Sequence, residues 1–554
     1  MTSTGAFLKK PCTQAVHEFS RRILNAPLWL VSIAVTVLAL VLRTWNSGHI
    51  NNSISDLNAR QALMAIDIIR GHFHFPNAPW ICEYDEAGLA WLLVPWVKLF
   101  GHQWSVFKSF GAVLASLTPG VLTWIAGRHW NRRTGLTAGL LMATLPAQLV
   151  WDRHLVVCAT AVSFIAWISS LRLVSVNPRD RRWRYILAGV IPGISTYVVQ
   201  YSPLILPILA GITYQEDRRH GRRLSVTAGK ITMTSFACLV AAAPVVIHKF
   251  YHPQYFQWRM RHVMTFTGHP GTDVRMYFMN LLGLLKELFV GDGIFYYLHD
   301  GLAVFTPVFS LLVLVGIGHL IVTDRRNALF VLGFPILLLL ILGFISAEDW
   351  RGVYHVHYIV FFCIAAALGL DRLCRWVSGP SSSFSEPWTH ALILAGIMVL
   401  HTVMFFYGPY RIHPPPYFMT RLQEDMRSGR DMPYLFSSDI PEVYHYHLPF
   451  WYVTRVDHPQ VSIFTWNDDG WFTHPDHLPI AFEPDDGALV GVVVRSDRLK
   501  AFIQKIGPDR VKSWRRLPRS GVIVVRCRIQ VPDILKRTWT DSLIPPILDV
   551  KKEP

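Results

Sequence analysis

The chain has 554 residues, of which 51% are hydrophobic and only 16% are charged. Soluble domains carry about 25% charged residues, so this deficit and the many long apolar runs indicate a polytopic membrane protein. The net charge of +16 does not indicate nucleic-acid binding, because the Arg and Lys residues form short clusters between apolar runs, as in cytoplasmic loops of membrane proteins. The seven cysteines are scattered and never spaced as Cys-x-x-Cys, which argues against a disulfide framework.

The first apolar run, Leu28 to Leu42, follows the polar segment 1–27 and is typical of a signal anchor rather than a cleavable signal peptide. Ten further apolar runs predict membrane-spanning helices. The predicted spans are 28–44, 104–126, 134–151, 155–174, 184–199, 202–214, 230–249, 301–322, 327–346, 354–370 and 389–408. The run 87–100 is shorter and contains Pro95 and Lys98, which leaves two interpretations, a span or an interfacial helix.

The distribution of positive charge decides between these interpretations. If 87–100 does not cross the membrane, five Arg-bearing loops lie on the same side as segment 1–27, namely 128–133, 177–184, 215–223, 323–327 and 371–375. The short loops on the opposite side, 152–154, 200–202 and 347–352, each carry at most one Lys or Arg. Cytoplasmic loops are enriched in Lys and Arg. We therefore predict that 87–100 is interfacial, that residues 1–27 are cytoplasmic and that the C-terminal region is extracytoplasmic.

The expected fold is an all-α polytopic membrane domain over residues 28–410, with about 11 transmembrane helices. Its first outer loop, 45–103, is expected to hold juxtamembrane helices, and a second large outer loop covers 250–300. Residues 411–554 have a soluble composition, in which the strand-like runs GALVGVVVR and SGVIVVRCRI flank the helical stretch SDRLKAFIQKIG. This alternation predicts a small α/β extracytoplasmic domain.

The first outer loop carries two groups of acidic residues. The stretch NNSISDLNARQALMAIDIIRGHF, residues 51–73, has the pattern of an amphipathic helix that begins near Asp56. A second group, Glu83, Asp85 and Glu86, comes just before the interfacial run 87–100. From the residues alone, Asp56 is either a helix N-cap or a carboxylate at the mouth of an intramembrane cavity.

These features, in this order, resemble the GT-C superfamily of membrane glycosyltransferases. The resemblance rests on one apolar run, an aspartate that opens a helix ending in Arg70-Gly71, an acid-bearing turn, the run WLLVPWVKLFG and a span that ends in basic residues. Over roughly residues 28–370 the chain is similar to bacterial lipid A aminoarabinose transferases and protein O-mannosyltransferases. The resemblance implies an inverting enzyme of the cell membrane that moves a sugar from a polyprenyl-phosphate donor to a lipid, glycan or protein acceptor on the extracytoplasmic face.

Carried over by position, the resemblance makes Asp56 the catalytic carboxylate, which removes the proton of the acceptor hydroxyl. Candidates for the acceptor site or a metal site are Glu83, Asp85, Glu86 and Asp152. Candidates for binding the donor phosphate, which needs cations to stabilise its developing charge, are Arg153, His154, Arg351, His355 and His357. The first-loop motif is commonly Asp-Glu in these relatives but is Asp56-Leu57 here, and Cys158 stands near the usual place of a second aspartate. The sequence therefore leaves open whether a divalent cation takes part.

Two other classes of protein were weighed. A secondary transporter or flippase should carry ionisable residues or helix breaks in the middle of its spans. Here the predicted spans are nearly free of such charges, and the acids gather in outer loops instead. A non-catalytic membrane assembly protein, in which the C-terminal domain binds a partner, is the second alternative and stays open at this level.

Overall fold

The computed structural model describes residues 26–45, 56–69, 71, 88–101, 104–153, 159–175, 181–199, 201–251, 270–291, 302–344, 355–378, 386–410, 434–437, 461–466, 472–473, 489–516 and 522–528. The chain divides into two compact units. The first unit holds the described residues up to Tyr410, except 56–71 and 97–101. Those two stretches fall with the C-terminal residues in the second unit.

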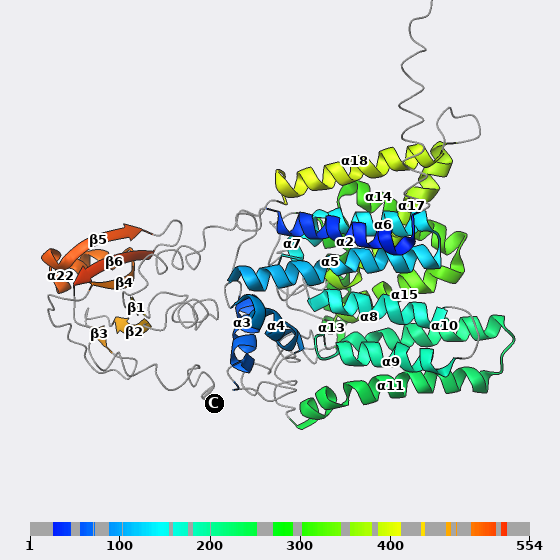
Figure 1. The fold of residues 1–554 in the computed structure, drawn as a ribbon, viewed down its shortest axis with the longest axis horizontal. Coiled ribbons are helices and arrows are strands. Elements are labelled where there is room, and N and C mark those ends of the chain that lie inside the picture. Colours follow the sequence, from blue (N-terminus) through cyan, green and yellow to red (C-terminus); the bar gives the residue numbers. More distant parts are fainter. Residues whose placement is uncertain are drawn as a thin grey trace, which may run out of the picture. The chain divides into compact units, whose positions relative to one another are not determined.

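The first unit is a bundle of helices, most of which run side by side (Figure 1). In chain order its described helices are α2 (Leu28–Thr44), α4 (Gly88–Phe100, whose last residues belong to the second unit), α5 (Trp104–His129), α6 (Arg132–Thr144), α7 (Pro146–Trp151), α8 (Ala159–Ser175), α9 (Arg182–Ser195), η1 (Ser202–Ile205), α10 (Leu206–Arg219), α11 (Leu224–Tyr251), α13 (Pro270–Phe289), α14 (Pro307–Val322), α15 (Arg325–Leu342), η2 (His355–Tyr358), α17 (Ile359–Val377) and α18 (Glu386–Phe406). Each predicted span overlaps at least one of these helices. The predominantly helical architecture is therefore confirmed.

Length and composition single out three of the described helices as able to cross a membrane, within α5, α11 and α18. Shorter apolar helices lie within α2, α4, α8, α14 and α15. The 13 residues of α4 extend roughly 20 Å, which is less than the hydrocarbon core of about 30 Å. The N–H of Gly88 at its start donates to the carbonyl oxygen of Tyr197, at 2.9 Å, just beyond α9.

Two elements differ from expectation. The predicted span 134–151 is two helices, because Leu145, which precedes Pro146, adopts an extended conformation (φ −56°, ψ 121°) that ends α6. Proline disfavours the helical conformation in the residue before it and cannot donate a backbone hydrogen bond. The second difference is α13, a helix of 20 residues in the predicted outer loop 250–300, where no helix was expected.

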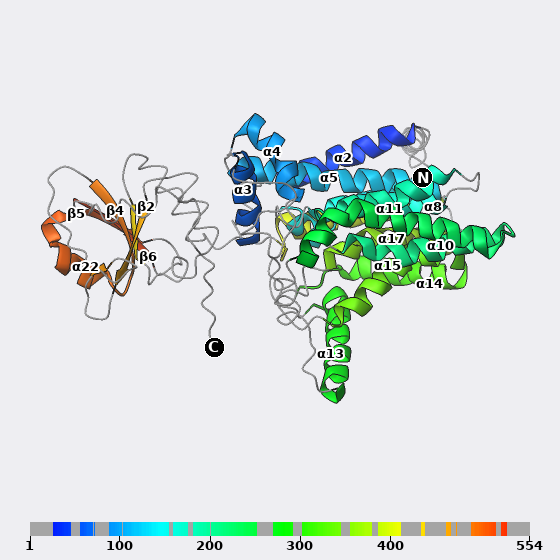
Figure 2. The same cartoon turned by 90° about the horizontal axis from the view of Figure 1, so that it is seen from below.

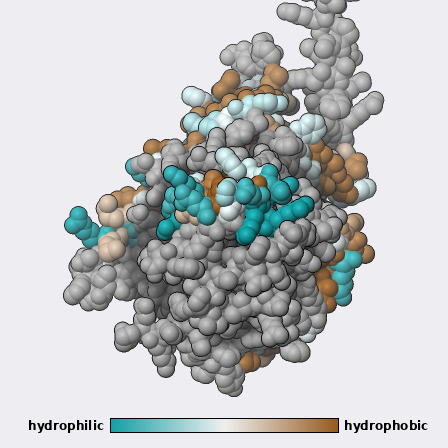
Figure 3. Space-filling model, turned by 90° about the vertical axis from the view of Figure 1, so that its left-hand side faces the viewer, coloured by the Kyte–Doolittle hydropathy of each residue, from teal (hydrophilic) through white to brown (hydrophobic). Residues whose placement is uncertain are grey.

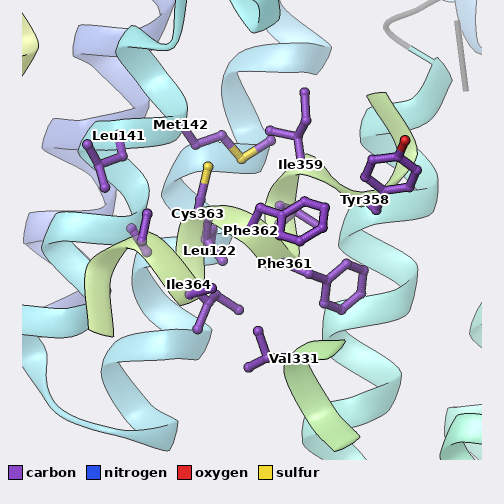
Figure 4. Close-up of a cluster of buried hydrophobic side chains, with 14 of the residues drawn as sticks. Leu122, Leu141, Met142, Val331, Tyr358, Ile359, Phe361, Phe362, Cys363 and Ile364 are labelled. Atoms are coloured by element: carbon purple, nitrogen blue, oxygen red, sulfur yellow. The ribbon is translucent and has the colours of Figure 1, made fainter. Parts of the chain in front are cut away.

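The core of the bundle is built around α17. Every residue from Ile359 to Asp371 is buried, as expected for a helix that is apolar on nearly all sides. Figure 4 shows its aromatic and aliphatic side chains among residues from other helices, including Leu122 of α5, Met142 of α6 and Val331 of α15.

Glycine sets the distance between α14 and α17. A Cβ atom on Gly316 would lie 1.8 Å from the carbonyl oxygen of Ala365, and one on Gly369 would lie 2.0 Å from that of Leu312. No side chain fits at either position, so the two backbones are in direct contact. Close approach at small residues is the usual way in which helices pack inside membranes.

The second unit contains α3 (Asp56–Ile69) and a six-stranded sheet of β1 (Tyr434–Ser437), β2 (Val461–Trp466), β3 (Phe472–Thr473), β4 (Leu489–Arg495), β5 (Val511–Arg516) and β6 (Val522–Arg528), in the order β3-β2-β1-β4-β6-β5. Strand β1 pairs in parallel with β2 and β4, whereas β6 is antiparallel to β4 and β5. Helix α22 (Leu499–Ile506) follows β4. The predicted small α/β fold of this region is confirmed, and α3 begins at Asp56, where a helix was expected.

The two ends of the bundle are chemically distinct. We call the end with the last turns of α2 and α18 and the first turn of α5 the outer end, because the charge pattern predicts it to be extracytoplasmic. The opposite, inner end is rich in arginine. There Arg133 and Arg375 both form ion pairs with Asp371, while Asp217 of α10 pairs with Lys230 of α11 at 2.8 Å.

Candidate functional site

A buried ion pair ties the end of α2 to the end of α7. Arg43 lies in the last turn of α2 and is completely buried. Its Nε donates to Oδ2 of Asp152 at 2.7 Å, and its Nη2 contacts the same oxygen. The side-chain amide of Gln148 donates to Oδ1 at 2.6 Å. Both carboxylate oxygens of Asp152 therefore accept hydrogen bonds from side chains, and the Asp152 carboxylate fixes the position of the Arg43 guanidinium.

The helix break described above places Asp152 in this position. Residues Pro146 to Trp151 form only one and a half turns, all of them buried, and Asp152 caps the end of that short helix. Burial raises the pKa of the Asp152 carboxyl, and the Arg43 guanidinium and the Gln148 amide counteract part of that rise. A buried carboxylate is stable only when such partners satisfy it.

Arg153, the next residue, is 5% exposed. Its Nη2 donates to the carbonyl oxygens of Leu42, at 3.0 Å, and Trp45, at 2.7 Å, both just past the last intrahelical bonds of α2. Its guanidinium carbon lies 4.7 Å from the centre of the Phe405 ring of α18. Burial and the neighbouring Arg43 charge lower the pKa of Arg153 to about 10, so the guanidinium stays protonated at neutral pH.

Sequence reasoning missed two cations of this cluster, Arg43 and Lys108. Lys108 lies in the second turn of α5, close enough to Arg153 for the two positive charges to interact. The available signal was that each of these two residues is a basic residue near the predicted outer end of its own span. Such residues usually extend to the lipid headgroups, and nothing in the sequence distinguishes them from residues that face a site.

Three cations and one carboxylate of the described residues thus interact at the outer end, from α2, α5 and the turn after α7. Asp152 is committed to Arg43, so positive charge predominates among these groups. We call Arg43, Lys108, Asp152 and Arg153 the outer cluster. Guanidinium and ammonium groups are well suited to the oxygens of anionic groups such as phosphate.

His357, the other predicted phosphate ligand whose side chain the structure describes, is held by different neighbours. It is almost fully buried in η2, and its imidazole forms a hydrogen bond with the hydroxyl of Tyr201. The Tyr201 ring is 4.6 Å away, centre to centre, and that of Trp167 is 6.3 Å away. These contacts fasten the start of α17 to α8 and to the residue before η1.

The remaining candidates cannot be placed at the level of side chains. Glu83, Asp85, Glu86, His154 and Arg351 lie outside the described residues. Asp56 and His355 are described only as the first residues of α3 and η2. In the part of the chain that the structure describes, no three His, Cys, Asp or Glu side chains gather as a metal-ion site would require. The role predicted for each candidate therefore stays a prediction.

Comparison with solved structures identifies the fold. The chain is similar to ArnT from Cupriavidus metallidurans bound to undecaprenyl phosphate, at 13% identity over 94% of this chain and 98% of that one, with a TM-score of 0.51. The chain shares the fold of ArnT. The apo state of ArnT gives 13% identity, 92% and 98% coverage and a TM-score of 0.50. The oligosaccharyltransferase of Archaeoglobus fulgidus in its apo form is 12% identical over 79% of this chain and 64% of that one, with a TM-score of 0.46.

No protein-family model matches the chain, and no curated protein matches it in sequence. At 13% identity the likeness to ArnT establishes the fold of a polytopic membrane protein and leaves the activity to be argued from the site. It confirms the fold that the resemblance implied. The likeness covers nearly the whole of both chains, so it includes the C-terminal region as well as the bundle.

Proposed function

We propose that this chain is a glycosyltransferase that moves a sugar from a polyprenyl-phosphate carrier to an acceptor on the extracytoplasmic face of the membrane. The outer cluster carries this proposal, because it places buried positive charge at the end of a GT-C bundle. The related fold of ArnT was solved with undecaprenyl phosphate bound. A lipid phosphate lies at the level of the headgroups, which is where the outer ends of membrane helices are found.

The outer cluster would stabilise the leaving group. When the bond between the anomeric carbon and the carrier phosphate breaks, the phosphate oxygen takes the electron pair and gains negative charge. Arg153 is fixed in advance by Leu42, Trp45 and Phe405, so it need not reorganise during the reaction. Preorganised charges in sites that exclude water stabilise a transition state far more than mobile ones. Asp152 acts as a positioning residue, because it touches Arg43 rather than the substrate.

Asp56 would act as the general base. The acceptor hydroxyl attacks the anomeric carbon from the side opposite the phosphate, its proton passes to the carboxylate of Asp56, and the sugar changes configuration at that carbon. The support for this role is the position of Asp56 at the start of α3, in the first outer loop, as the resemblance requires. The acceptor is a lipid, a glycan or a protein, and the sugar is a hexose or a pentose.

The proposal includes the topology. Eleven spans, formed by α2, α5, α6 with α7, α8, α9, α10, α11, α14, α15, α17 and α18, would cross the cell membrane with the N-terminus in the cytoplasm. Residues 28–410 would then form the catalytic domain, and residues 411–554 an extracytoplasmic domain. The inner end supports this orientation, because it carries the arginine-rich helix ends that cytoplasmic loops favour.

The test is sugar transfer by the purified full-length protein in lipid nanodiscs. A panel of polyprenyl-phosphate sugars is supplied, and release of the free carrier phosphate is measured. Asp56→Asn should lose turnover while it keeps donor binding. Asp67→Asn, on the same helix, is the matched control and should keep both. Full turnover by Asp56→Asn would contradict the assignment of the base.

The same preparation separates the alternatives. A flippase would move a labelled carrier lipid between leaflets without releasing its sugar, and Asp56→Asn would leave that movement unchanged. A non-catalytic assembly protein would do neither. Either outcome with every donor of the panel would overturn the proposed activity.

A further inference from the structure

Three arginines from three helices come together at the inner end of the bundle. Arg128 lies in the last turn of α5, Arg172 in the last turn of α8 and Arg184 in the first turn of α9. The positive charges of Arg128 and Arg184 both act on Arg172. We call these three residues the inner triad. Like charges repel one another at a cost in free energy, which a negatively charged partner would remove.

Other arginines of the inner end have such a partner in a carboxylate. Arg133 and Arg375, for example, both pair with Asp371. Among the residues that the structure describes, neither Arg128 nor Arg172 forms an ion pair with a carboxylate. The positive charge of these two residues is therefore able to act on a ligand.

Neutral groups fix the position of the Arg172 guanidinium. Its Nη2 donates to the carbonyl oxygen of Arg128 at 3.3 Å, and its Nη1 lies 3.5 Å from Nδ1 of His129. Nε2 of His129 is 3.0 Å from Oδ1 of Asn327, whose amide nitrogen donates to Asp324 at 2.8 Å. Because a guanidinium only donates and an amide oxygen only accepts, the imidazole is neutral and carries its proton on Nε2. These contacts use two of the five N–H groups of the guanidinium, so others remain for a ligand.

On α5, an exposed apolar stripe ends at the triad. Leu117 and Trp124 lie eleven and four positions before Arg128, so the three side chains share one face of the helix, and all three are exposed. Eleven positions of α-helix extend about 16 Å, and one leaflet of the hydrocarbon core is about 15 Å thick. The stripe therefore matches the acyl chains of one leaflet, and Arg128 is then at the level of the headgroups. Exposed tryptophans such as Trp124 are common near that level.

Helix α9 has the same pattern. Trp183, Leu187 and Ile194 are exposed at spacings of four and eleven positions, and the guanidinium carbon of Arg184 lies 5.6 Å from the centre of the Trp183 ring. Helix α8 packs against both α5 and α9, which places Arg172 between the two stripes (Figure 1). The triad therefore lies where two lipid-facing surfaces meet the end of the bundle.

The level of the triad in the membrane follows from the direction of the helices. Helices α5, α10 and α11 run in nearly the same direction in Figure 2, and α5 and α11 are long and apolar enough to cross a membrane. Helices that cross a membrane define its normal, so their inner ends lie near one membrane surface. Hydrophobic side chains are also exposed elsewhere on the described surface, around the margins of the view in Figure 3.

We propose that the inner triad binds the phosphate of an anionic glycerophospholipid in the inner leaflet, whose acyl chains lie along the exposed stripes of α5 and α9. Arg172 donates to the phosphate oxygens, and Arg128 and Arg184 complete the positive site. A lipid fits better than a free phosphate, because apolar stripes begin at the charges. An anionic headgroup fits better than a zwitterionic one, because a headgroup ammonium would meet three positive charges. The outer cluster is at the other end, so the proposal does not depend on the transferase activity.

The test measures lipid binding to the purified full-length protein by native mass spectrometry. Phosphatidylglycerol and phosphatidylethanolamine with identical acyl chains are titrated separately, and the first should bind more tightly. Arg128→Gln/Arg184→Gln should weaken phosphatidylglycerol binding by roughly tenfold or more, because two cations are lost. The matched control, Arg218→Gln/Arg372→Gln, removes the same charge from exposed positions of the inner end outside the triad and should bind as the unchanged protein does.

Photolabelling locates the acyl chains in the unchanged protein, so this part of the test does not depend on the folding of a variant. Phosphatidylglycerol that carries a diazirine near the end of one acyl chain should label α5 near Leu117 or α9 near Ile194. Labelling centred instead on α11, whose exposed face includes Phe236, would overturn the proposal.

Three results of the titrations would also overturn it. Equal affinity for the two lipids would show that the headgroup charge is not recognised. Equal losses for the two double variants would show that only the total surface charge matters. Glycerophosphoglycerol, which is the headgroup without acyl chains, should bind far more weakly than the lipid, and equal binding would assign the triad to a soluble phosphate ester.

Discussion

At the inner end of the bundle, carboxylates bind cations from neighbouring helices, whereas at the outer end the buried Arg153 contacts backbone carbonyl oxygens and an aromatic ring. Asp217 accepts hydrogen bonds from Thr227 at 2.9 Å and from Lys230 at 2.8 Å, which fastens α10 to α11. At the outer end, the contacts described for Arg153 are two carbonyl oxygens and the ring of Phe405. Carbonyl and ring contacts fix a guanidinium without cancelling its charge.

This difference indicates two uses of buried charge in one bundle. An ion pair between helices stabilises their packing once both charges have lost their water. A cation held by dipoles and an aromatic ring keeps an electrostatic potential that can act on a ligand. The outer cluster contains both kinds of buried charge. Asp152 neutralises Arg43, whereas the adjacent Arg153 contacts two carbonyl oxygens and the Phe405 ring. The predictions below test this distinction.

The largest effect on stability is expected at Arg43. Arg43→Met leaves the buried carboxylate of Asp152 without its main partner, which should cost about 3–5 kcal/mol in free energy of unfolding. The double variant Arg43→Met/Asp152→Leu should recover most of that loss. Equilibrium unfolding in mixed micelles measures both. Arg375→Gln, which removes a half-exposed ion pair at the inner end, is the control and should cost about 1 kcal/mol or less. Equal losses in free energy of unfolding for Arg43→Met and Arg375→Gln would contradict the proposed difference between the outer and inner ends.

The largest effect on activity is expected at Arg153. Arg153→Gln should lower kcat of sugar transfer by about 10²–10³-fold, because one preorganised charge is lost from the leaving-group site. Arg153→Lys keeps the charge and should retain part of the activity. Turnover is measured with saturating donor, and unfolding is measured in parallel. Arg172, in the last turn of α8, donates to the carbonyl oxygen of Arg128 at the inner end, and Arg172→Gln should leave kcat unchanged. A variant that loses stability but no turnover would show that Arg153 is only structural.

A smaller effect, on stability alone, is expected at Thr227. Thr227→Val removes the hydroxyl that donates to Asp217 and should cost about 1–3 kcal/mol, because a buried charged acceptor loses one hydrogen bond. Since this contact lies at the inner end, the KM and kcat of sugar transfer should not change. A fall in kcat with normal donor binding would contradict the separation of roles.

The smallest effect is expected at Phe405. Phe405→Leu removes the aromatic ring that lies 4.7 Å from the Arg153 guanidinium, an interaction of about 0.5–2 kcal/mol. The expected result is a rise in the KM for the polyprenyl-phosphate sugar and a fall in kcat, each of a few-fold. Phe406→Leu, whose ring is farther from Arg153, at 5.8 Å, should have a weaker effect. The reverse order of the two variants would show that the ring does not position the guanidinium.

Much of the fold was predictable because its signals are local. Apolar runs located the helices of the bundle, and alternating apolar residues located β4 and β6 on either side of α22. The break before Pro146 had a local signal too, which the continuous apolar pattern of 134–151 obscured. Helix α13 was missed because polar and charged residues interrupt its apolar ones, so its sequence lacks the long uninterrupted run typical of a span.

The site was less predictable because it depends on contacts between distant segments. Asp152 appeared in the sequence as one acid among several, and only the structure shows that Arg43 engages it. Arg153 was named by resemblance, yet the neutral groups that hold it come from α2 and α18. Lys108 had no motif around it. The charges of the inner end were recognised as loop residues, but their pairing across helices was not.

The ion pair between Arg43 and Asp152 also constrains how the protein is made. The two residues are 109 positions apart in the chain, and Arg43 is in the first described helix. At translation speeds of 5–20 residues per second, roughly 5 to 20 s separate the synthesis of the two partners. During that interval the nascent α2 carries an arginine whose carboxylate does not yet exist. The first helix must therefore wait at the membrane, with its charge near the headgroups, until Asp152, eight residues past the end of α6, has been made and lets it pack.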